Sequence, residues 1–211
     1  CSICIDAGPD FRYQMLRAGV KKLDAILITH QHKDHIGGLD DARPYIFIQK
    51  KPMTVYASPE AQEEIKREYS YAFADGDEKY PGAPTFDLID IDDSIIKINE
   101  LVIEPIKLKH FTITSYAFRI DKFAYVTDLS ELSKEAFNKL RGVEYLIIEA
   151  LRHEKHYSHI SLSEAVDIAQ RLNVKKAWFT HIGHSMGKAS DVNPTLPNNM
   201  MLAYDGLEIC I

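Results

Sequence analysis

Four potential metal ligands lie within six consecutive residues, in the order His30, His32, Asp34 and His35. In an extended loop, His30 and His32 can both reach one metal ion, while Asp34 and His35 can turn toward a second. Imidazole and carboxylate groups together suit Zn²⁺, Mn²⁺ or Fe²⁺. This segment, which we name the histidine motif, therefore predicts half of a two-metal site.

Three more candidates each close a predicted strand farther along the chain. They are His110, Asp128 and His181, and each follows a short apolar run. A single histidine at a strand end is more often a structural residue with satisfied hydrogen bonds. Three such residues beside the histidine motif favour metal ligation instead, because strand ends at one sheet edge converge while lying far apart in sequence.

A two-metal site favours an anionic substrate. Two divalent cations about 3.5–4 Å apart can share a hydroxide and clamp both oxygens of an in-line displacement at phosphorus. The cations contribute about +4, Asp34 and Asp128 about −2 and the hydroxide about −1, so the site stays near +1. This charge favours an anionic substrate that the metal-bound hydroxide would attack, and it makes Asp34 a predicted catalytic residue as well as a ligand.

The leaving alkoxide needs a proton, and His159 is the predicted donor. It precedes by two residues the capping box of Ser161 and Glu164, so we expect its loop to face the sheet edge. A structural role is the competing interpretation of His159. Four further residues could contact phosphate or substrate, and surface charge explains them about as well: Arg152, His153, His156 and His184.

The composition is that of an ordinary globular chain. Its 211 residues are 45% apolar and 27% charged, which allows one domain, residues 1–211, with a sizeable core. Lysine and arginine number 25 against 31 acidic residues, a net charge of −6 that disfavours nucleic-acid binding. No apolar run reaches the roughly 18 residues of a membrane span.

Three cysteines, Cys1, Cys4 and Cys210, form no disulfide framework and favour a cytoplasmic compartment. Cys1 and Cys4 match a CxxC pattern, but the pattern runs into an apolar strand. Strand positions i and i+3 point to opposite faces. We therefore expect two small strand residues rather than a metal or redox site.

The apolar periodicity predicts strands and helices mixed in one domain. Short apolar runs over residues 86–128 are separated by turns, as in an antiparallel meander. Strands are predicted at 2–6, 24–29, 86–91, 94–98, 101–108, 116–120, 123–127, 145–150, 176–180 and, as one or two strands, 201–211. Helices are predicted at 11–18 with Asp10 as N-cap, at 59–70 with Ser58 as N-cap, at 133–140 with Ser133 as N-cap, and at 162–172. This order predicts two sheets packed face to face with helices outside.

Residues 69–83 combine Tyr69, Tyr71, Phe73 and Tyr80 with glycine, aspartate and proline. A loop with a few packed aromatic rings is the ordinary interpretation. The functional alternative is a lid over an active site or an interface between two copies in a homodimer.

These residues, in their order and context, resemble the motifs of the metallo-β-lactamase superfamily over nearly the whole chain. The resemblance implies an αββα sandwich with two divalent metal ions, Zn or Mn, along one edge. The resemblance implies that the first metal is bound by His30, His32 and His110. It implies that the second metal is bound by Asp34, His35 and His181, and that Asp128 bridges the two metals. Asp6, in Ile-Asp-Ala-Gly, would support the histidine motif without binding metal.

The chain is most similar to the phosphodiesterases of the phosphonate-metabolism (PhnP-like) branch, whose bacterial enzyme in that pathway cleaves a ribosyl cyclic phosphate. The similar segments begin at Ile5, Gly38, Ala150 and Thr180. The branch implies a small cyclic or nucleotide-like phosphodiester as substrate, and often a dimer. It also implies a glycine-rich strand, and often a cysteine-rich zinc insert, before the position of Cys1. We expect both to be missing from this chain.

Three other functions stay open. One is hydrolysis of a thioester or lactone, as in enzymes of the glyoxalase II kind. Another is a nuclease of the tRNA-processing kind, which the acidic balance and the lack of a basic arm disfavour. The last is a metal-binding protein without catalysis, or one that supports cofactor biosynthesis. His159 favours the phosphodiesterase.

Overall fold

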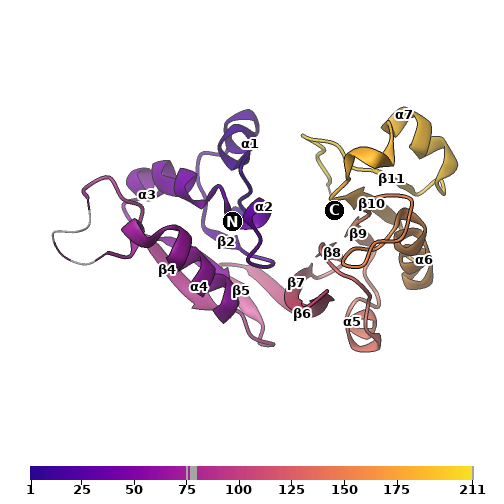
Figure 1. The fold of residues 1–211 in the computed structure, drawn as a ribbon, viewed down its shortest axis with the longest axis horizontal. Helices are drawn as coiled ribbons and strands as arrows, with labels where there is room; N and C mark the ends of the chain where they lie inside the picture. Colours follow the sequence, from indigo (N-terminus) through magenta and orange to yellow (C-terminus); the bar gives the residue numbers. More distant parts are fainter. Residues whose placement is uncertain (75, 77–79, 211) are drawn as a thin grey trace. The chain divides into compact units, whose positions relative to one another are not determined.

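The structure is a computed structural model that describes residues 1–74, 76 and 80–210. The chain divides into two compact units, Cys1–Leu101 and Val102–Ile211. Each unit has helices of its own (Figure 1). Each unit also has its own cluster of buried apolar side chains. The fold is the mixed α/β fold that the sequence predicts, while one domain over the whole chain stays a prediction.

A parallel sheet in the order β1-β2-β3-β4 forms the first unit. Its strands are β1 (Ile3–Ile5), β2 (Ala25–Leu27), β3 (Met53–Ala57) and β4 (Phe86–Asp90). Parallel neighbours need crossover connections, which contain helices here. These are α1 (Phe11–Arg17), α2 (Lys33–Ile36), η1 (Leu39–Ala42), α3 (Arg43–Gln49) and α4 (Pro59–Glu68). The 3-10 helix η2 (Ser70–Ala72) and strand β5 (Ile96–Ile98) complete the unit.

Apolar residues of the central strands and helices form the core of the first unit. Ile26 of β2, Val55 of β3 and Ile65 of α4 are fully buried in one cluster. Helix α4 lies against β3 and β4. Burying each side chain of this size contributes about 1.5–3 kcal/mol, so this cluster holds β2, which leads into the histidine motif, in place.

The second unit contains a mixed sheet in the order β11-β10-β9-β8-β7-β6. Its strands are β6 (Leu101–His110), β7 (Ile113–Ile120), β8 (Phe123–Val126), β9 (Tyr145–Glu149), β10 (Lys176–Thr180) and β11 (Met200–Leu202). Its helices are α5 (Lys134–Lys139), α6 (Leu162–Leu172), η4 (His184–Met186), α7 (Ala189–Val192) and η5 (Asn193–Thr195). Pairs β6–β7 and β7–β8 are antiparallel, and β8–β9, β9–β10 and β10–β11 are parallel. Strands β6, β8, β9 and β10 therefore run in one direction and end at one edge.

Serine caps start three helices as predicted. The Ser58 hydroxyl accepts the amide of Ala61 at 3.2 Å, and the Ser133 hydroxyl accepts that of Ala136 at 3.1 Å. Ser161 and Glu164 form the predicted capping box. Each such cap stabilises its helix by about 1 kcal/mol. The predicted cap at Asp10 is wrong, because its side chain makes no capping hydrogen bond.

One prediction for the strands is wrong. Strand β4 pairs in parallel with β3, so residues 86–91 do not belong to the antiparallel meander. Among residues 201–210, which the structure describes, the one strand is β11, whose last residue is Leu202, and this agrees with the one or two strands predicted there. The amide of Leu207 donates to the carbonyl of Tyr204 at 3.0 Å, and this turn ends the extended chain. The sequence interpretation also missed β3 and α3.

The described part of segment 69–83 packs on its own unit. The hydroxyl of Tyr69 donates to the carbonyl of Ile36 at 2.8 Å, and the hydroxyl of Tyr71 bonds the carboxylate of Asp40. These contacts fit the ordinary interpretation of packed aromatic rings. Residues 75 and 77–79 of the segment lie outside the described residues.

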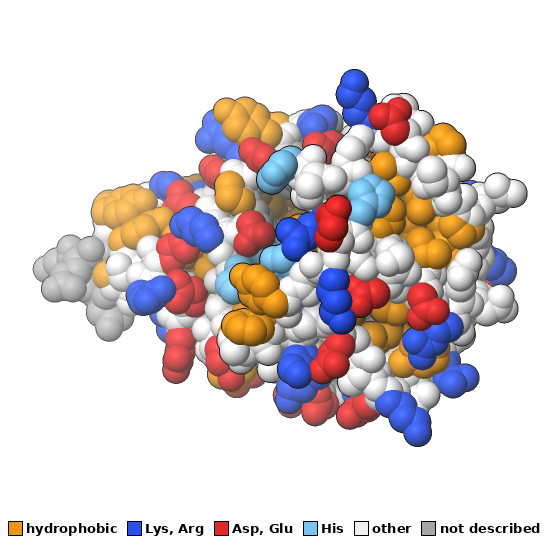
Figure 2. All heavy atoms as spheres, turned by 45° about the vertical axis from the view of Figure 1, so that its right-hand side comes forward, with side chains coloured by type: hydrophobic (Ala, Val, Ile, Leu, Met, Phe, Trp, Pro, Cys, Tyr) orange, Lys and Arg blue, Asp and Glu red, His pale blue; other side chains and the backbone are white. Residues whose placement is uncertain are grey.

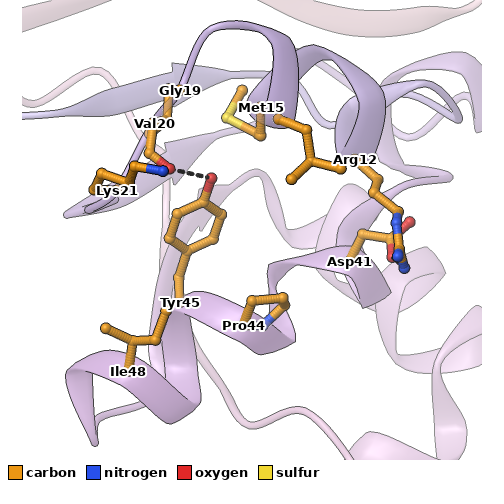
Figure 3. A pocket seen from close by; sticks show the side chains of 10 residues that line it. Arg12, Met15, Gly19, Val20, Lys21, Asp41, Pro44, Tyr45 and Ile48 are labelled. Atoms are coloured by element: carbon orange, nitrogen blue, oxygen red, sulfur yellow. Dashed lines mark hydrogen bonds and ion pairs between the residues drawn. The ribbon is translucent and has the colours of Figure 1, made fainter.

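Helices α1 and α3 border an apolar groove of about 290 Å³ (Figure 3). Met15 and Leu16 line it from α1, and Tyr45 and Ile48 line it from α3. The Tyr45 hydroxyl donates to the carbonyl of Val20 at 3.1 Å, which ties α3 to the segment after α1. None of the predicted metal ligands lines this groove. Among the described residues, no helix is long and apolar enough to cross a membrane.

Candidate metal and catalytic site

In the first unit, Asp6 organises the histidine motif. Its carboxylate accepts the backbone amide of Thr29 at 2.8 Å and the Thr29 hydroxyl at 2.9 Å. The same carboxylate lies 2.7 Å from Nδ1 of His35, which is 5% exposed. A carboxylate on one ring nitrogen fixes the orientation of an imidazole and leaves Nε2 to coordinate a metal. The contacts are those expected of Asp6.

His30 and His32 direct one nitrogen each toward the same point. Nε2 of His30 and Nδ1 of His32 are 2.8 Å apart, and the rings meet edge to face. Two nitrogens of a tetrahedral zinc site with Zn–N bonds of 2.0–2.1 Å lie about 3.3 Å apart. A shift of these rings by about half an ångström would bring the two nitrogens to the separation that one shared ion requires. The spacing in the sequence predicts such a shared ion.

Asp34 and His35 lie on helix α2 rather than in a loop. His32 is the N-cap of this helix, with extended backbone. The carboxylate of Asp34 is 62% exposed, and its Oδ2 lies 3.4 Å from Nε2 of His35. Adjacent helical residues thus direct a carboxylate oxygen and an imidazole nitrogen toward a common region, which supports ligation of one ion by both.

Glycines let the turn after β1 approach the histidine motif closely. A Cβ atom added to Gly8 would lie 2.4 Å from the carbonyl oxygen of Asp34, and one added to Gly38 would lie 2.1 Å from that of Gly8. Backbone hydrogen bonds join the same segments, from Ala7 to His35 and from Gly38 to Ala7, each at 2.7 Å. The turn that contains Asp6 is therefore tightly packed on the histidine motif.

In the second unit, Asp128 lies between two histidines. Its Oδ1 is 3.6 Å from Nε2 of His110, and its Oδ2 is 3.5 Å from Nε2 of His181. Nδ1 of His110 donates to the carbonyl of Ser158 at 2.9 Å, which leaves Nε2 as the coordinating nitrogen. A carboxylate with one oxygen toward each of two imidazoles suits a ligand that bridges two ions.

The sequence interpretation missed Glu149, the last residue of β9. Its Oε1 accepts the backbone amide of Leu129 at 2.6 Å, and its Oε2 lies 2.7 Å from Nδ1 of His159. Asp128, Glu149, His159 and His181 each offer one ligand atom, and these atoms lie within 4.8 Å of one another. The only signal in the sequence was one acidic residue at the end of the apolar run Tyr145–Glu149.

Burial, followed by the carboxylate of Asp128, raises the pKa of Glu149 to about 8. The backbone amide of Leu129 and the ring of His181 oppose this rise. A carboxyl oxygen 2.7 Å from a ring nitrogen orients the imidazole through a hydrogen bond. Glu149 therefore fixes the ring of His159 through Nδ1, so that Nε2 is the nitrogen that faces away from the pair.

Several site residues have a left-handed backbone. Asp6, Asp128 and His181 follow the ends of β1, β8 and β10 with φ values of 62°, 55° and 53°. Residues other than glycine rarely adopt this conformation, and it costs free energy that surrounding contacts must offset. It turns each side chain at the strand end. The strain thus coincides with the residues that the sequence assigns to the site.

The four residues considered for contact with phosphate or substrate mostly bond to nearby groups of the chain. The guanidinium of Arg152 donates to the carbonyls of Glu154 and Lys155, at 3.3 and 3.0 Å. Nε2 of His153 lies 3.0 Å from the carbonyl of Met186, and Nδ1 of His156 lies 3.0 Å from the hydroxyl of Ser158. His184 is exposed on η4.

The cysteines behave as ordinary residues. All three thiols are free. Burial, followed by the charge of Asp6, raises the pKa of the Cys4 thiol to about 12. Such a thiol stays protonated at neutral pH and is a poor metal ligand.

Comparisons with known proteins point to one family. A family model described as a beta-lactamase superfamily domain matches residues 2–182. The crystal structure of a new diphosphatase from the PhnP family is similar with a TM-score of 0.88. That protein is 35% identical, and the match covers 97% of this chain and 77% of that chain.

Two curated proteins are similar to this chain over only part of their own length. An octanoyltransferase of Porphyromonas gingivalis is 32% identical over 211 residues, 99% of this chain but 42% of that protein. The chain thus spans less than half the length of this relative. A ribonuclease Z of Agathobacter rectalis is 32% identical over 92 residues, 40% of this chain and 30% of that protein.

Proposed function

Because the chain belongs to the PhnP family of metal-dependent hydrolases in the β-lactamase superfamily, we propose that it is a two-metal phosphodiesterase for a small, anionic phosphodiester. The arrangement of Asp128 between His110 and His181 is the observation that most supports this proposal. The diphosphatase in the same family supports a reaction at phosphorus.

The proposed metal ligands are five histidines and two aspartates. His30, His32 and His110 would hold the first ion, Asp34, His35 and His181 would hold the second, and Asp128 would serve both. The division into two ligand sets follows from family membership, and the contacts within each unit support it. The ions are Zn²⁺ or Mn²⁺, since these ligands accept both. When bound, they supply the nucleophile and neutralise charge on the phosphate.

The residues of the chain have separate tasks in this reaction. Asp6 orients the ring of His35 through Nδ1, and Asp34 contributes an exposed carboxylate for binding and catalysis. His159 donates a proton from Nε2 to the leaving oxygen. Glu149 holds the other ring nitrogen of His159 and so directs Nε2 toward the reacting group.

One experiment tests the metal site and the activity together. We would measure metal content by elemental analysis and hydrolysis of bis-p-nitrophenyl phosphate with added Zn²⁺ or Mn²⁺. The test variant is Asp128→Asn, and the matched control is Asp121→Asn, because both aspartates have left-handed φ values, 55° and 52°, in the same unit. Asparagine tolerates this backbone conformation, so neither substitution should disturb the fold.

We expect about two metal ions per chain in the wild type and in Asp121→Asn, with metal-dependent turnover. Asp128→Asn should lose at least one ion and most of the activity. Two bound ions without any phosphodiester turnover would instead favour a thioester or lactone substrate. No stoichiometric metal after reconstitution would contradict the proposal altogether.

The second candidate is a nuclease, which the partial match to ribonuclease Z favours. The net charge of −6 argues against it. Acidic and basic side chains are interspersed on the face shown in Figure 2, without a continuous basic area. If the protein cleaved a tRNA precursor faster than any small phosphodiester, the nuclease would become the preferred function. A homodimer stays a prediction, which gel filtration tests.

A further inference from the structure

Two aromatic side chains of the second unit are exposed beside the candidate site. Phe111 is 54% exposed and Tyr157 is 71% exposed. Their rings meet edge to face, with centroids 5.2 Å apart. Phe111 directly follows His110, and Tyr157 precedes His159 by two residues. The pair thus adjoins both a proposed metal ligand and the proposed proton donor.

Phe111 occupies a backbone position that favours glycine. It is the first residue of the two-residue connection between β6 and β7, where His110 pairs with Ile113. Its φ is 53°. Glycine is the preferred residue at a positive φ in such hairpin connections. A phenylalanine here costs free energy, which points to a task for its ring outside the fold.

The aromatic pair lines a groove of about 370 Å³ whose lining residues all belong to the second unit. This volume lies in the range of about 300–1,000 Å³ that is typical of small-molecule sites. Lys109 and Lys155 add positive charge. Lys109 pairs with Glu131 at 3.0 Å, whereas Lys155 approaches Glu164 only at 3.9 Å and is 83% exposed. Lys155 is thus the lysine that can turn toward an anionic ligand.

A row of rings leads from this groove to the candidate site. The ring of His156 lies 4.2 Å from that of Tyr157 and 5.3 Å from that of His159. The ring of His159 lies 4.8 Å from that of His110. A ligand whose phosphate reacts near His159 can therefore extend a planar group over Tyr157.

We propose that this groove, lined by Phe111, Lys155, His156 and Tyr157 and named here the aromatic groove, binds the nucleobase of a nucleotide-type substrate. A nucleobase is planar and aromatic, so it stacks on exposed rings whatever its sequence identity. Lys155 contacts an acceptor atom of the base or a neighbouring phosphate. A ribosyl cyclic phosphate without a base has no group to fill the groove. The inference rests on the proposed function and narrows its substrate class.

The test measures binding by calorimetry, using the metal-loaded protein. Adenosine 5′-monophosphate and ribose 5-phosphate share the sugar and the phosphate and differ in the base. The test variants are Phe111→Gly, which removes the ring at a position where glycine is favoured, and Tyr157→Ala on the exposed surface. Tyr204→Ala is the control, since Tyr204 is 60% exposed in the same unit and does not line the groove.

We expect the wild type and Tyr204→Ala to bind the adenine nucleotide at least about tenfold more tightly than ribose 5-phosphate. Phe111→Gly and Tyr157→Ala should each reduce this preference about fivefold or more. Equal affinities in the wild type, or an unchanged preference in both variants, would overturn the inference.

Failure of the proposed function has a different signature. If no phosphodiester is cleaved while the preference for the adenine nucleotide persists, the proposed function fails and the aromatic groove stands. If phosphodiesters are cleaved without any preference for the base, the aromatic groove fails and the proposed function stands.

Discussion

The carboxylate of Glu149 lies 2.7 Å from Nδ1 of His159, and its other oxygen accepts the amide of Leu129. Because Leu129 follows Asp128 in the chain, one buried side chain contacts both His159, the proposed proton donor, and the segment that contains Asp128, the proposed bridging ligand. Glu149 is fully buried, so removing either partner leaves an uncompensated polar group. This relationship leads to the first two predictions.

His159→Ala should slow the reaction in a way that depends on the leaving group. With an alkyl leaving group, which must be protonated, we expect kcat to fall about 10²- to 10⁴-fold. With p-nitrophenolate, which leaves without a proton, the fall should stay below about tenfold. Steady-state kinetics on both substrates measure the difference, and unchanged metal content serves as control. Equal losses on both substrates would contradict the role as proton donor.

Glu149→Gln should act through His159. We expect a loss of about 10- to 100-fold in kcat, again larger for the alkyl leaving group, because the ring loses its orientation. The informative comparison is the double variant Glu149→Gln, His159→Ala. If Glu149 works by positioning His159, the double variant is no slower than His159→Ala alone. Additive losses would assign Glu149 an independent task.

Gly8→Ala should impair metal binding while most of the stability remains. The added methyl group would meet the carbonyl oxygen of Asp34 at 2.4 Å, so helix α2 must move. Elemental analysis should show loss of metal, and activity should fall at least about tenfold. Gly206→Ala is the control, since its Cβ meets open space although its φ is 86°. Normal metal content in Gly8→Ala would show that the turn can shift without moving α2.

Asp24 should contribute stability that is lost in acid. Lys22 and the amide of Ser2 bond its carboxylate, at 2.7 and 2.9 Å, and they lower its pKa below the ordinary value. A carboxyl with a lower pKa in the folded state stabilises the fold above its unfolded pKa, about 3.9. That contribution disappears as the pH falls through the folded pKa.

Asp24→Asn should therefore reduce the free energy of unfolding at neutral pH by about 1 kcal/mol. Below the folded pKa of Asp24, the wild type and the variant should become equally stable. Urea unfolding at neutral pH and at successively lower pH measures both quantities, with Asp121→Asn as the exposed control. A constant difference at all pH values would assign the effect to packing instead of charge.

The proposed metal ligands could be selected from the sequence because their residue types and spacing follow simple patterns. The histidine motif is dense in sequence, and His110, Asp128 and His181 each follow an apolar strand. Glu149 could not be found in this way, since a single glutamate after apolar residues is also typical of a strand that ends at the surface. Only the contact with His159, ten residues away in sequence, reveals its task.

In the fold, features set by neighbouring residues were likewise easier to predict than contacts between residues far apart in sequence. Caps at Ser58, Ser133 and Ser161 depend on residues three positions away, and all three are present. The pairing of β4 with β3 depends on a crossover through α4, and the apolar run at residues 86–91 carries no sign of its partner. The sequence therefore predicted a strand there but assigned it to the wrong sheet.

The left-handed backbone at Asp6, Asp128 and His181 also affects how the protein can change under selection. Glycine would relax each of these strand ends, yet it would remove the side chain that the site needs. A laboratory population selected for thermal stability alone should therefore accumulate glycine or asparagine at these three positions and become inactive. Selection for turnover should reverse those substitutions first. At these three positions, a gain in thermal stability should therefore come with a loss of activity, and both quantities can be measured on the same variants.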